Sequence, residues 1–229
     1  MHILFYTLIF FYLINIFYYY YKKIFNNNFN LLAYLIKKFL YYLDYKVEPF
    51  DINVFPSKMI VISSHTSIYD FIIGTLFYYG YLHERYNSYV LMKYQFEVIC
   101  SPIIQYFDKK FKLISIKKNE EINVKKGVTH QIYNKLKDKD NFIIFIAPEG
   151  TRKCTDKLRS GYWVIAHKLD IDILYIGIDF LNKNIFLENP RKAKNTWENE
   201  QEEFIISCKK YIPLYPERCY WTKDFYINN

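Results

Sequence analysis

Short apolar runs rich in isoleucine and valine alternate with segments of helical periodicity, and this alternation limits the fold more than any other feature of the chain. The predicted strands cover residues 59–63, 89–92, 112–116, 142–146 and 173–179, with a further short strand at 185–187. Helices are expected at residues 67–82, around 122–136, at 161–169 and at 198–210, the last of them polar. Apolar strands separated by helices are typical of a parallel sheet covered on both faces. The pattern therefore predicts an α/β fold with a largely parallel, mixed sheet flanked by helices.

The N-terminal stretch is apolar enough to enter a membrane. Residues 3–21 carry no charge and only two strongly polar side chains, Thr7 and Asn15. At about 1.5 Å per residue, a helix of this length spans about 28 Å, close to the roughly 30 Å hydrocarbon core of a bilayer. Tyrosines and then Lys22 and Lys23 follow, and the positive-inside rule places the later chain on the cytosolic side. We therefore expect an N-terminal hydrophobic membrane helix over residues 1–23.

Other interpretations of this stretch stay open. An apolar helix can lie in the membrane interface without spanning the bilayer, or it can be buried in the protein. A cleavable signal peptide is disfavoured, because no basic region precedes the apolar run and no small-residue cleavage site follows it.

Residues 24–50 are expected to form an amphipathic helix and a connector. Apolar residues recur at helical spacing from Leu31 to Leu43, and Lys37 and Lys38 lie on the other side. A basic amphipathic helix of this kind can lie on an anionic bilayer. Packing against the protein core, with the basic face in water, explains the pattern equally well.

The composition indicates a folded protein with an anionic partner. With 52% hydrophobic and 21% aromatic residues, the chain is not intrinsically disordered. Its net charge of +8 suits a membrane surface, a phosphorylated substrate or a nucleic acid, and the apolar N-terminus favours the membrane. The four cysteines form no C-x-x-C pair, which indicates free thiols in a reducing compartment.

A histidine and an aspartate interrupt the apolar sequence directly after the strand predicted at residues 59–63. They form an H-x-x-x-x-D motif within SSHTSIYD, residues 63–70. Because a histidine pKa lies near ~6.5, His65 can accept a proton at neutral pH, and Asp70 can hold one ring nitrogen and orient the other. The same stretch fits a helix capping box, in which Ser67 caps the helix and Asp70 reaches back. We expect Asp70 to serve both purposes.

The spacing alone does not identify a site. His167 and Asp172 are separated by the same interval, but His167 lies within an apolar helical pattern, so we expect a structural or surface residue. His83 and His130 have no carboxylate at such spacing, and His2 adjoins the apolar N-terminal segment. A second motif is needed to distinguish His65 from these histidines.

That second motif is PEGTR, residues 148–152, which directly follows the strand predicted at 142–146. Gly150 permits a close backbone approach or a positive φ. Arg152 offers a planar donor fork for a phosphate, and Glu149 can bind a hydroxyl or hold the arginine. Functional groups of open α/β sheets gather at the carboxyl ends of the strands, so the two motifs are expected to share a cleft.

Together, SHTSIYD and APEGTR resemble the motifs of the glycerolipid acyltransferase family, whose members acylate glycerol 3-phosphate and lysophosphatidic acid. The resemblance covers residues 59–180. Six residues match the family's pattern: His65, Asp70, Glu149, Gly150, Thr151 and Arg152. Shorter blocks support it: SPI at 101–103, LISIKK at 113–118, LRSGY at 158–162 and IDILY at 171–175.

The chain also departs from the family's pattern. Ser64 replaces the common asparagine before the histidine, and Lys117 and Lys118 replace an aspartate and a phosphate-binding arginine. Asp172 and Tyr175 replace two prolines. Since lysine keeps the charge of arginine but lacks its bidentate geometry, the choice of head group is expected to differ more than the reaction.

The resemblance implies a membrane-bound O-acyltransferase of phospholipid biosynthesis, with residues 51–229 as its catalytic domain. His65, oriented by Asp70, would deprotonate the hydroxyl of a lysophospholipid or glycerol phosphate, and that oxygen would attack an acyl thioester directly. The implied substrate-binding residues are Lys117, Lys118, Glu149, Gly150, Thr151 and Arg152. No metal or cofactor is implied, because acyl-CoA or an acyl carrier protein thioester is a co-substrate. The implied location is a membrane, the endoplasmic reticulum in a eukaryote, with the catalytic domain on the cytosolic face.

Two other functions explain part of the sequence. A non-catalytic, membrane-bound relative that binds lipid would account for Lys117, Lys118 and the missing prolines. A nucleic-acid-binding protein would account for the charge but not for the motifs or the apolar N-terminus, so nucleic acid is not an expected partner. A serine hydrolase is disfavoured because the chain has no G-x-S-x-G sequence.

Overall fold

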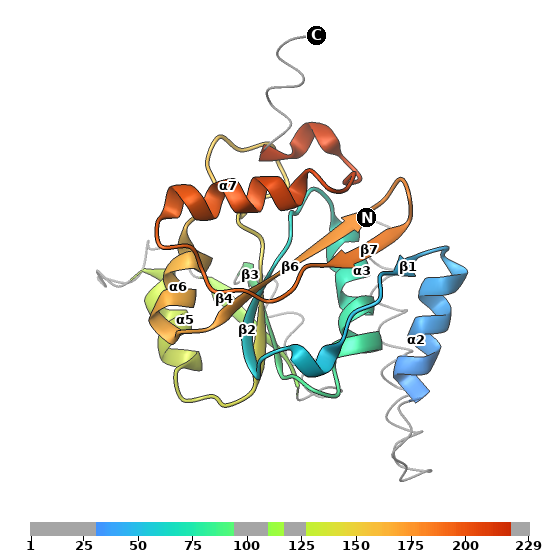
Figure 1. Cartoon of the computed structure of the whole chain (residues 1–229), viewed down its shortest axis with the longest axis horizontal. Coiled ribbons are helices and arrows are strands. Elements are labelled where there is room, and N and C mark those ends of the chain that lie inside the picture. Colours follow the sequence, from blue (N-terminus) through green and yellow to red (C-terminus); the bar gives the residue numbers. More distant parts are fainter. Residues whose placement is uncertain (1–30, 94–109, 117–126, 221–229) are drawn as a thin grey trace.

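A computed structural model of the protein describes residues 31–93, 110–116 and 127–220 (Figure 1). Its strands in these ranges are β1 (Lys46–Val47), β2 (Lys58–Ile62), β3 (Ser88–Lys93), β4 (Phe111–Ile116), β5 (Phe142–Ile146), β6 (Asp172–Asp179) and β7 (Asn184–Leu187). The α-helices are α2 (Leu31–Tyr42), α3 (Ile68–Phe77), α5 (Val128–Leu136), α6 (Gly161–Leu169) and α7 (Trp197–Cys208). Shorter helices are η1 (Ile52–Val54), η2 (Tyr78–Leu82) and η3 (Pro216–Arg218).

The described strands form a seven-stranded sheet in the order β1-β7-β6-β2-β5-β3-β4. Neighbouring strands are parallel except β6 and β7, which form an antiparallel pair. The expected largely parallel, mixed sheet is thus confirmed. β2 and β5 lie next to each other near the centre, in a register that pairs Ile62 with Ile146, the last residue of each strand. Whatever follows these two strands therefore emerges side by side.

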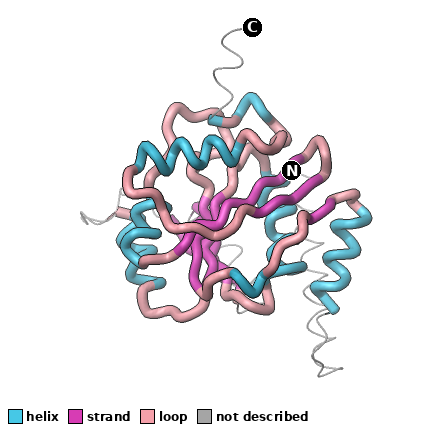
Figure 2. The backbone as a smooth tube through the Cα atoms, in the orientation of Figure 1, coloured by secondary structure: helices cyan, strands magenta, loops and turns pink. Residues whose placement is uncertain are grey.

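Helices cover both faces of the sheet, with α2 and α3 on one side and α5 and α6 on the other (Figures 1 and 2). Met59 and Val61 of β2 belong to the core under α2 and α3, whereas Ile60 and Ile62 belong to the core under α5, α6 and α7. These four side chains are at most 1% exposed. Alternate side chains of a strand point to opposite faces, so a strand buried on both faces is apolar throughout. This explains the sequence MIVI.

Helix α2 packs against the core, as one of the two interpretations of its pattern predicted. Leu32, Ile36 and Leu40 are buried, while Tyr41 and Tyr42 are 75% and 80% exposed. No helix within the described ranges is both long and apolar enough to cross a bilayer. The membrane helix expected over residues 1–23 lies outside the described residues.

Helix α7 corrects the expectation of a polar C-terminal helix. Its inner face buries Phe204 and Cys208, and also Glu200, which has no exposed surface. The Glu200 carboxylate accepts two hydrogen bonds of 3.0 Å from the Arg191 guanidinium and one of 2.9 Å from the Lys194 backbone N–H. A buried charge is tolerated when it is paired and hydrogen-bonded in this way. The hydrophobic periodicity of the sequence does not indicate this buried face of α7, because a glutamate occupies one of its interior positions.

Candidate active site

Two loops meet where β2 and β5 end, because the strands are adjacent and parallel with their last residues paired. The loop after β2 carries Ser64 and His65, and the loop after β5 carries Glu149. The Ser64 hydroxyl donates a hydrogen bond of 2.6 Å to Glu149 Oε1 in the interior. The two sequence motifs, separated by 85 positions at this pair, are therefore in direct contact, as the expected shared cleft requires.

His65 lies beside Asp70, with 3.4 Å between its Nδ1 and the carboxylate Oδ2. The imidazole side chain is 27% exposed and the carboxylate 9%. This distance is long for a hydrogen bond, but catalytic contacts often tighten only when substrate is bound. A proton on Nδ1 faces the carboxylate in this arrangement, which leaves Nε2 as the ring nitrogen that can accept a proton.

The same Asp70 oxygen holds the start of α3. Oδ2 accepts hydrogen bonds of 2.6 Å from the backbone N–H groups of Thr66 and Ser67. In return, Ser67 Oγ accepts from the N–H groups of Tyr69 at 3.0 Å and Asp70 at 3.3 Å, which completes a capping box. The Asp70 carboxylate is thus held in place by its hydrogen bonds at the start of α3, independently of its contact with His65. Both arrangements expected of Asp70, capping and contact with the imidazole, occur at one oxygen.

The turn after β5 depends on a glycine. Gly150 has a φ of +62°, a conformation that L side chains rarely adopt. A Cβ at this position would lie 2.5 Å from Arg159 Nε. The Arg159 side chain therefore crosses directly over the turn, and its backbone N–H donates to the Pro148 carbonyl at 2.8 Å. Arg159 belongs to the LRSGY block of the sequence, but no local pattern indicates that it reaches this turn.

The comparisons with known proteins agree with this geometry. A family model described as Acyltransferase matches residues 50–179, which is more than half of the 229-residue chain. The chain belongs to the acyltransferase family. No curated protein matches it.

The acyltransferase match extends from just before β2 to the last residue of β6, so it contains both loops of the site. Membership of the family supports acyl transfer as the activity of this enzyme. Helices α2 and α7 and the segment that contains η3 lie outside the matched residues.

Glu149 is buried at the candidate site, with 2% of its surface exposed. Its Oε2 has no hydrogen-bond partner among the residues that the structure describes. Burial raises the pKa of Glu149 to about 6, against the opposing effects of the Ser64 hydrogen bond and the nearby His65. Burial, followed by the Glu149 charge, also raises the pKa of the Cys208 and Cys219 thiols. The Glu149 side chain thus lies in the protein interior and accepts the hydrogen bond of the Ser64 hydroxyl.

Four cations lie on the loop that follows Glu149. Arg152, Lys153, Lys157 and Arg159 are all exposed. In the described part of the chain, none of the four is paired with a carboxylate. Unpaired cations beside a turn provide a place for an anionic group. Thr151 has a local role in this loop, because its Oγ1 accepts from the Lys153 N–H at 3.2 Å.

Lys117 and Lys118, the two other residues predicted to bind substrate, lie outside the described residues. The second pair with H-x-x-x-x-D spacing has a structural role, as expected. His167 is exposed and its Nε2 lies 3.0 Å from the Lys194 carbonyl, while Asp172 is paired with Lys192 at 3.2 Å. Spacing alone therefore does not bring a histidine and an aspartate together.

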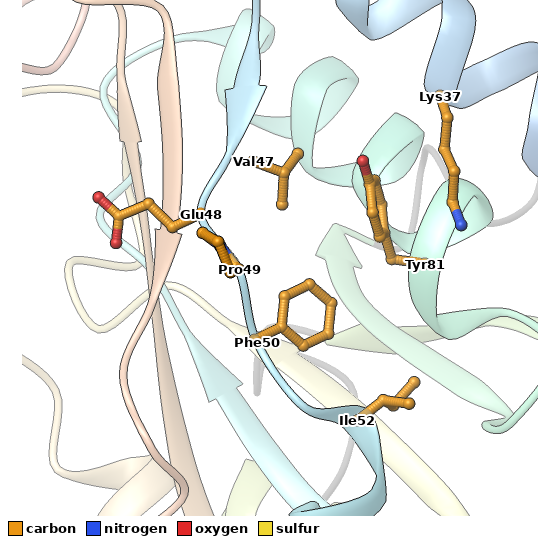
Figure 3. Close-up of a pocket in the computed structure, with 7 residues that line it drawn as sticks. All are labelled: Lys37, Val47, Glu48, Pro49, Phe50, Ile52 and Tyr81. Atoms are coloured by element: carbon orange, nitrogen blue, oxygen red, sulfur yellow. The ribbon is translucent and has the colours of Figure 1, made fainter.

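A hollow of about 290 Å³ lies at the other end of the sheet (Figure 3). Its lining residues are Lys37, Val47, Glu48, Pro49, Phe50, Ile52 and Tyr81. The Lys37 ammonium lies 4.6 Å from the centre of the Tyr81 ring, and the Glu48 side chain points away from that ring toward Asn184. Ile52 precedes β2 whereas His65 follows it, so the length of the strand separates this hollow from the candidate site.

Proposed function

We propose that the protein transfers a fatty acyl group from an acyl thioester to the hydroxyl of a lysophospholipid or glycerol phosphate. The observation that carries the proposal is the contact between His65 and Asp70 at the carboxyl end of β2, beside the PEGTR turn. In this proposal His65 is the general base and Asp70 orients it. Membership of the acyltransferase family supports the class of reaction.

The proposed reaction forms one ester bond and breaks one thioester bond. His65 Nε2 takes the proton of the acceptor hydroxyl, and the Asp70 carboxylate stabilises the resulting imidazolium. The acceptor oxygen attacks the thioester carbonyl directly, and the tetrahedral intermediate collapses with loss of the thiolate. The imidazolium then returns its proton to the thiolate, which leaves as a thiol. A positioned base of this kind contributes roughly 10²–10⁴-fold to the rate.

The acceptor phosphate is proposed to bind the cations around the PEGTR turn. Arg152 and Arg159 are exposed, without carboxylate partners in the described ranges, and they offer planar donor forks. Lys118, with Lys117 beside it, is proposed to add positive charge. Gly150 and Thr151 shape the turn, and Glu149 acts from the interior through Ser64 rather than by touching the phosphate. The donor is proposed to be acyl-CoA or acyl carrier protein, with no metal or cofactor.

The enzyme is proposed to work at a membrane surface, on its cytosolic face, and at the endoplasmic reticulum in a eukaryote. The outer side of α2 supports this location, because aromatic and basic side chains lie there together. The side chains concerned are Tyr34, Leu35, Lys37, Lys38, Tyr41 and Tyr42. Aromatic rings and lysines are the side chains that settle at the boundary between lipid and water. The apolar N-terminal sequence supports the same location.

The test is acylation by the full-length protein in membranes, measured by mass spectrometry with a panel of lyso-acceptors and an acyl-CoA. We expect ester formation by the wild type and a loss of at least about 10²-fold in His65→Ala. The matched control is His130→Ala, because His130 lies on α5 outside the site. Equal rates for wild type and His65→Ala would refute the assignment of the base. Lipid binding by a wild type that acylates no acceptor would instead support a non-catalytic lipid-binding relative.

A further inference from the structure

The C-terminal segment brings a second arginine to the loop that carries His65. Arg218 ends η3, and its Nη1 donates a hydrogen bond of 3.2 Å to the carbonyl of Thr66, the residue directly after His65. Figure 1 shows the segment after α7 at the same end of the molecule as the start of α3. Because Thr66 adjoins His65, this contact places the guanidinium at the loop that carries the imidazole.

The position of the Arg218 guanidinium is fixed by its surroundings. It lies 3.9 Å from the centre of the Tyr215 ring, a cation–π contact. Backbone hydrogen bonds of 3.0 Å from Arg218 to Tyr215 and from Cys219 to Pro216 hold the turn. The next residue, Cys219, is completely buried and serves as an anchor. An arginine held in this way loses little side-chain entropy when it binds a further group.

Within the described residues, most of the hydrogen-bonding capacity of the Arg218 guanidinium is unused. A guanidinium carries five N–H donors, and the Thr66 carbonyl takes one of them. The side chain is 41% exposed, and Glu217 lies 3.7 Å from Nε in an exposed pair. Exposed ion pairs of this kind contribute little, so Glu217 does not prevent an anion from binding.

We propose that Arg218 binds the phosphate of the acceptor and so determines its specificity. The inference rests on the proposed function, in which the acceptor hydroxyl lies at His65 and the phosphate is attached to the same glycerol unit. Arg218 supplies the bidentate fork that lysine at position 118 lacks. It lies beyond residues 50–179, the part of the chain that the acyltransferase family model matches.

The experiment compares a lipid with and without its phosphate. Binding of lysophosphatidic acid and of monoacylglycerol, which lacks the phosphate, is measured with full-length protein in nanodiscs. In Arg218→Gln we expect about 10- to 100-fold weaker binding of lysophosphatidic acid and unchanged binding of monoacylglycerol. Arg218→Lys should fall between wild type and Arg218→Gln, because it keeps the charge and loses the fork. Lys137→Gln, which removes one charge at the far end of the sheet, should behave like wild type.

Kinetics separate phosphate binding from support of the loop. With a phosphate-bearing acceptor, Arg218→Gln should raise KM much more than it lowers kcat, whereas Glu217→Gln should leave KM close to that of wild type, because the exposed ion pair contributes little. If Arg218→Gln weakened the binding of both lipids equally, or lowered kcat at unchanged KM, the proposal would be overturned. Either result would mean that Arg218 only supports the backbone at Thr66. A wild type that binds both lipids equally would overturn it too. Selective binding without turnover would refute the proposed function and leave this inference standing.

Discussion

The hydroxyl of Ser64 donates a 2.6 Å hydrogen bond to the buried carboxylate of Glu149, and this bond joins the loop that carries His65 to the PEGTR turn. Ser64 stands where the family usually has asparagine, so the serine keeps a donor at this position. The bond fixes the two motifs relative to each other without involving the reacting atoms. Its removal therefore tests how much the site depends on the link between its loops.

Ser64→Ala should destabilise the protein and reduce its activity. The change leaves Glu149 Oε1 buried without this donor, at a cost of roughly 1–3 kcal/mol. The free energy of unfolding in urea and the initial rate of acylation measure the two effects. Ser63→Ala is the matched control, because the Ser63 hydroxyl only donates to the adjacent Ser64 carbonyl at 3.3 Å. An equal effect of both substitutions would contradict a special role for the Ser64 bond.

Glu149→Gln should change how stability depends on pH. Burial raises the pKa of Glu149 in the folded protein from 4.5 to about 6, so its carboxyl group favours folding when it is protonated. That contribution is complete below the unfolded pKa and is lost as the pH rises through about 6. Above pH 6 the glutamine variant should thus be more stable than wild type, by about 2 kcal/mol at most. Urea unfolding at pH 4.5 and 7 tests this, and an unchanged difference between the two pH values would contradict it.

Gly150→Ala should destabilise the fold and displace Arg159. The left-handed conformation costs an L residue roughly 1–2 kcal/mol, and the added Cβ would meet Arg159 Nε. The melting temperature and the KM for a phosphate-bearing acceptor should both report the change. Gly74→Ala is the control, because Gly74 lies inside α3 and an added Cβ would meet nothing within 4 Å apart from its chain neighbours and the backbone of its own helix. There the substitution should stabilise the helix by roughly 0.5–1 kcal/mol, so the two glycines should show opposite signs.

Asp70→Asn should separate catalysis from capping. The amide oxygen can still accept from the backbone N–H groups of Thr66 and Ser67, so the cap is largely kept. The charge that stabilises the His65 imidazolium is lost, and the rate should fall roughly 10²-fold or more. The measurements are kcat/KM and the unfolding midpoint, with Asp70→Ala for comparison. A stability loss as large as that of the alanine variant, with an unchanged rate, would assign Asp70 to the cap alone.

Local patterns were sufficient to predict most of the sheet. The strand at residues 142–146 and the helix at 161–169 have the predicted bounds, because each has a clear apolar pattern with marked ends. Asn141 and Pro148 bracket the strand, and Ser160 and Asp170 flank the helix. The capping box was also predictable, since all of its hydrogen bonds join residues within four positions of one another.

The contacts that complete the site were not predictable in this way. The Ser64–Glu149 bond depends on β2 and β5 being neighbours, and strand order is not encoded in either strand. Arg218 carries no local signal, because its contact with Thr66 exists only after the chain has passed α7 and turned back. The burial of Glu200 also carries no local signal, because its partner, Arg191, lies in a different segment.

The burial of residues 59–62 of β2 also affects how the enzyme loses activity. Amide hydrogens of a strand hydrogen-bonded on both sides and covered on both faces exchange with solvent only when the whole domain opens. His65 follows this strand by three residues, and Asp70 is tied to the first turn of α3. Local opening at the surface therefore leaves His65 and Asp70 aligned. Heat inactivation should coincide with global unfolding of the described domain rather than precede it.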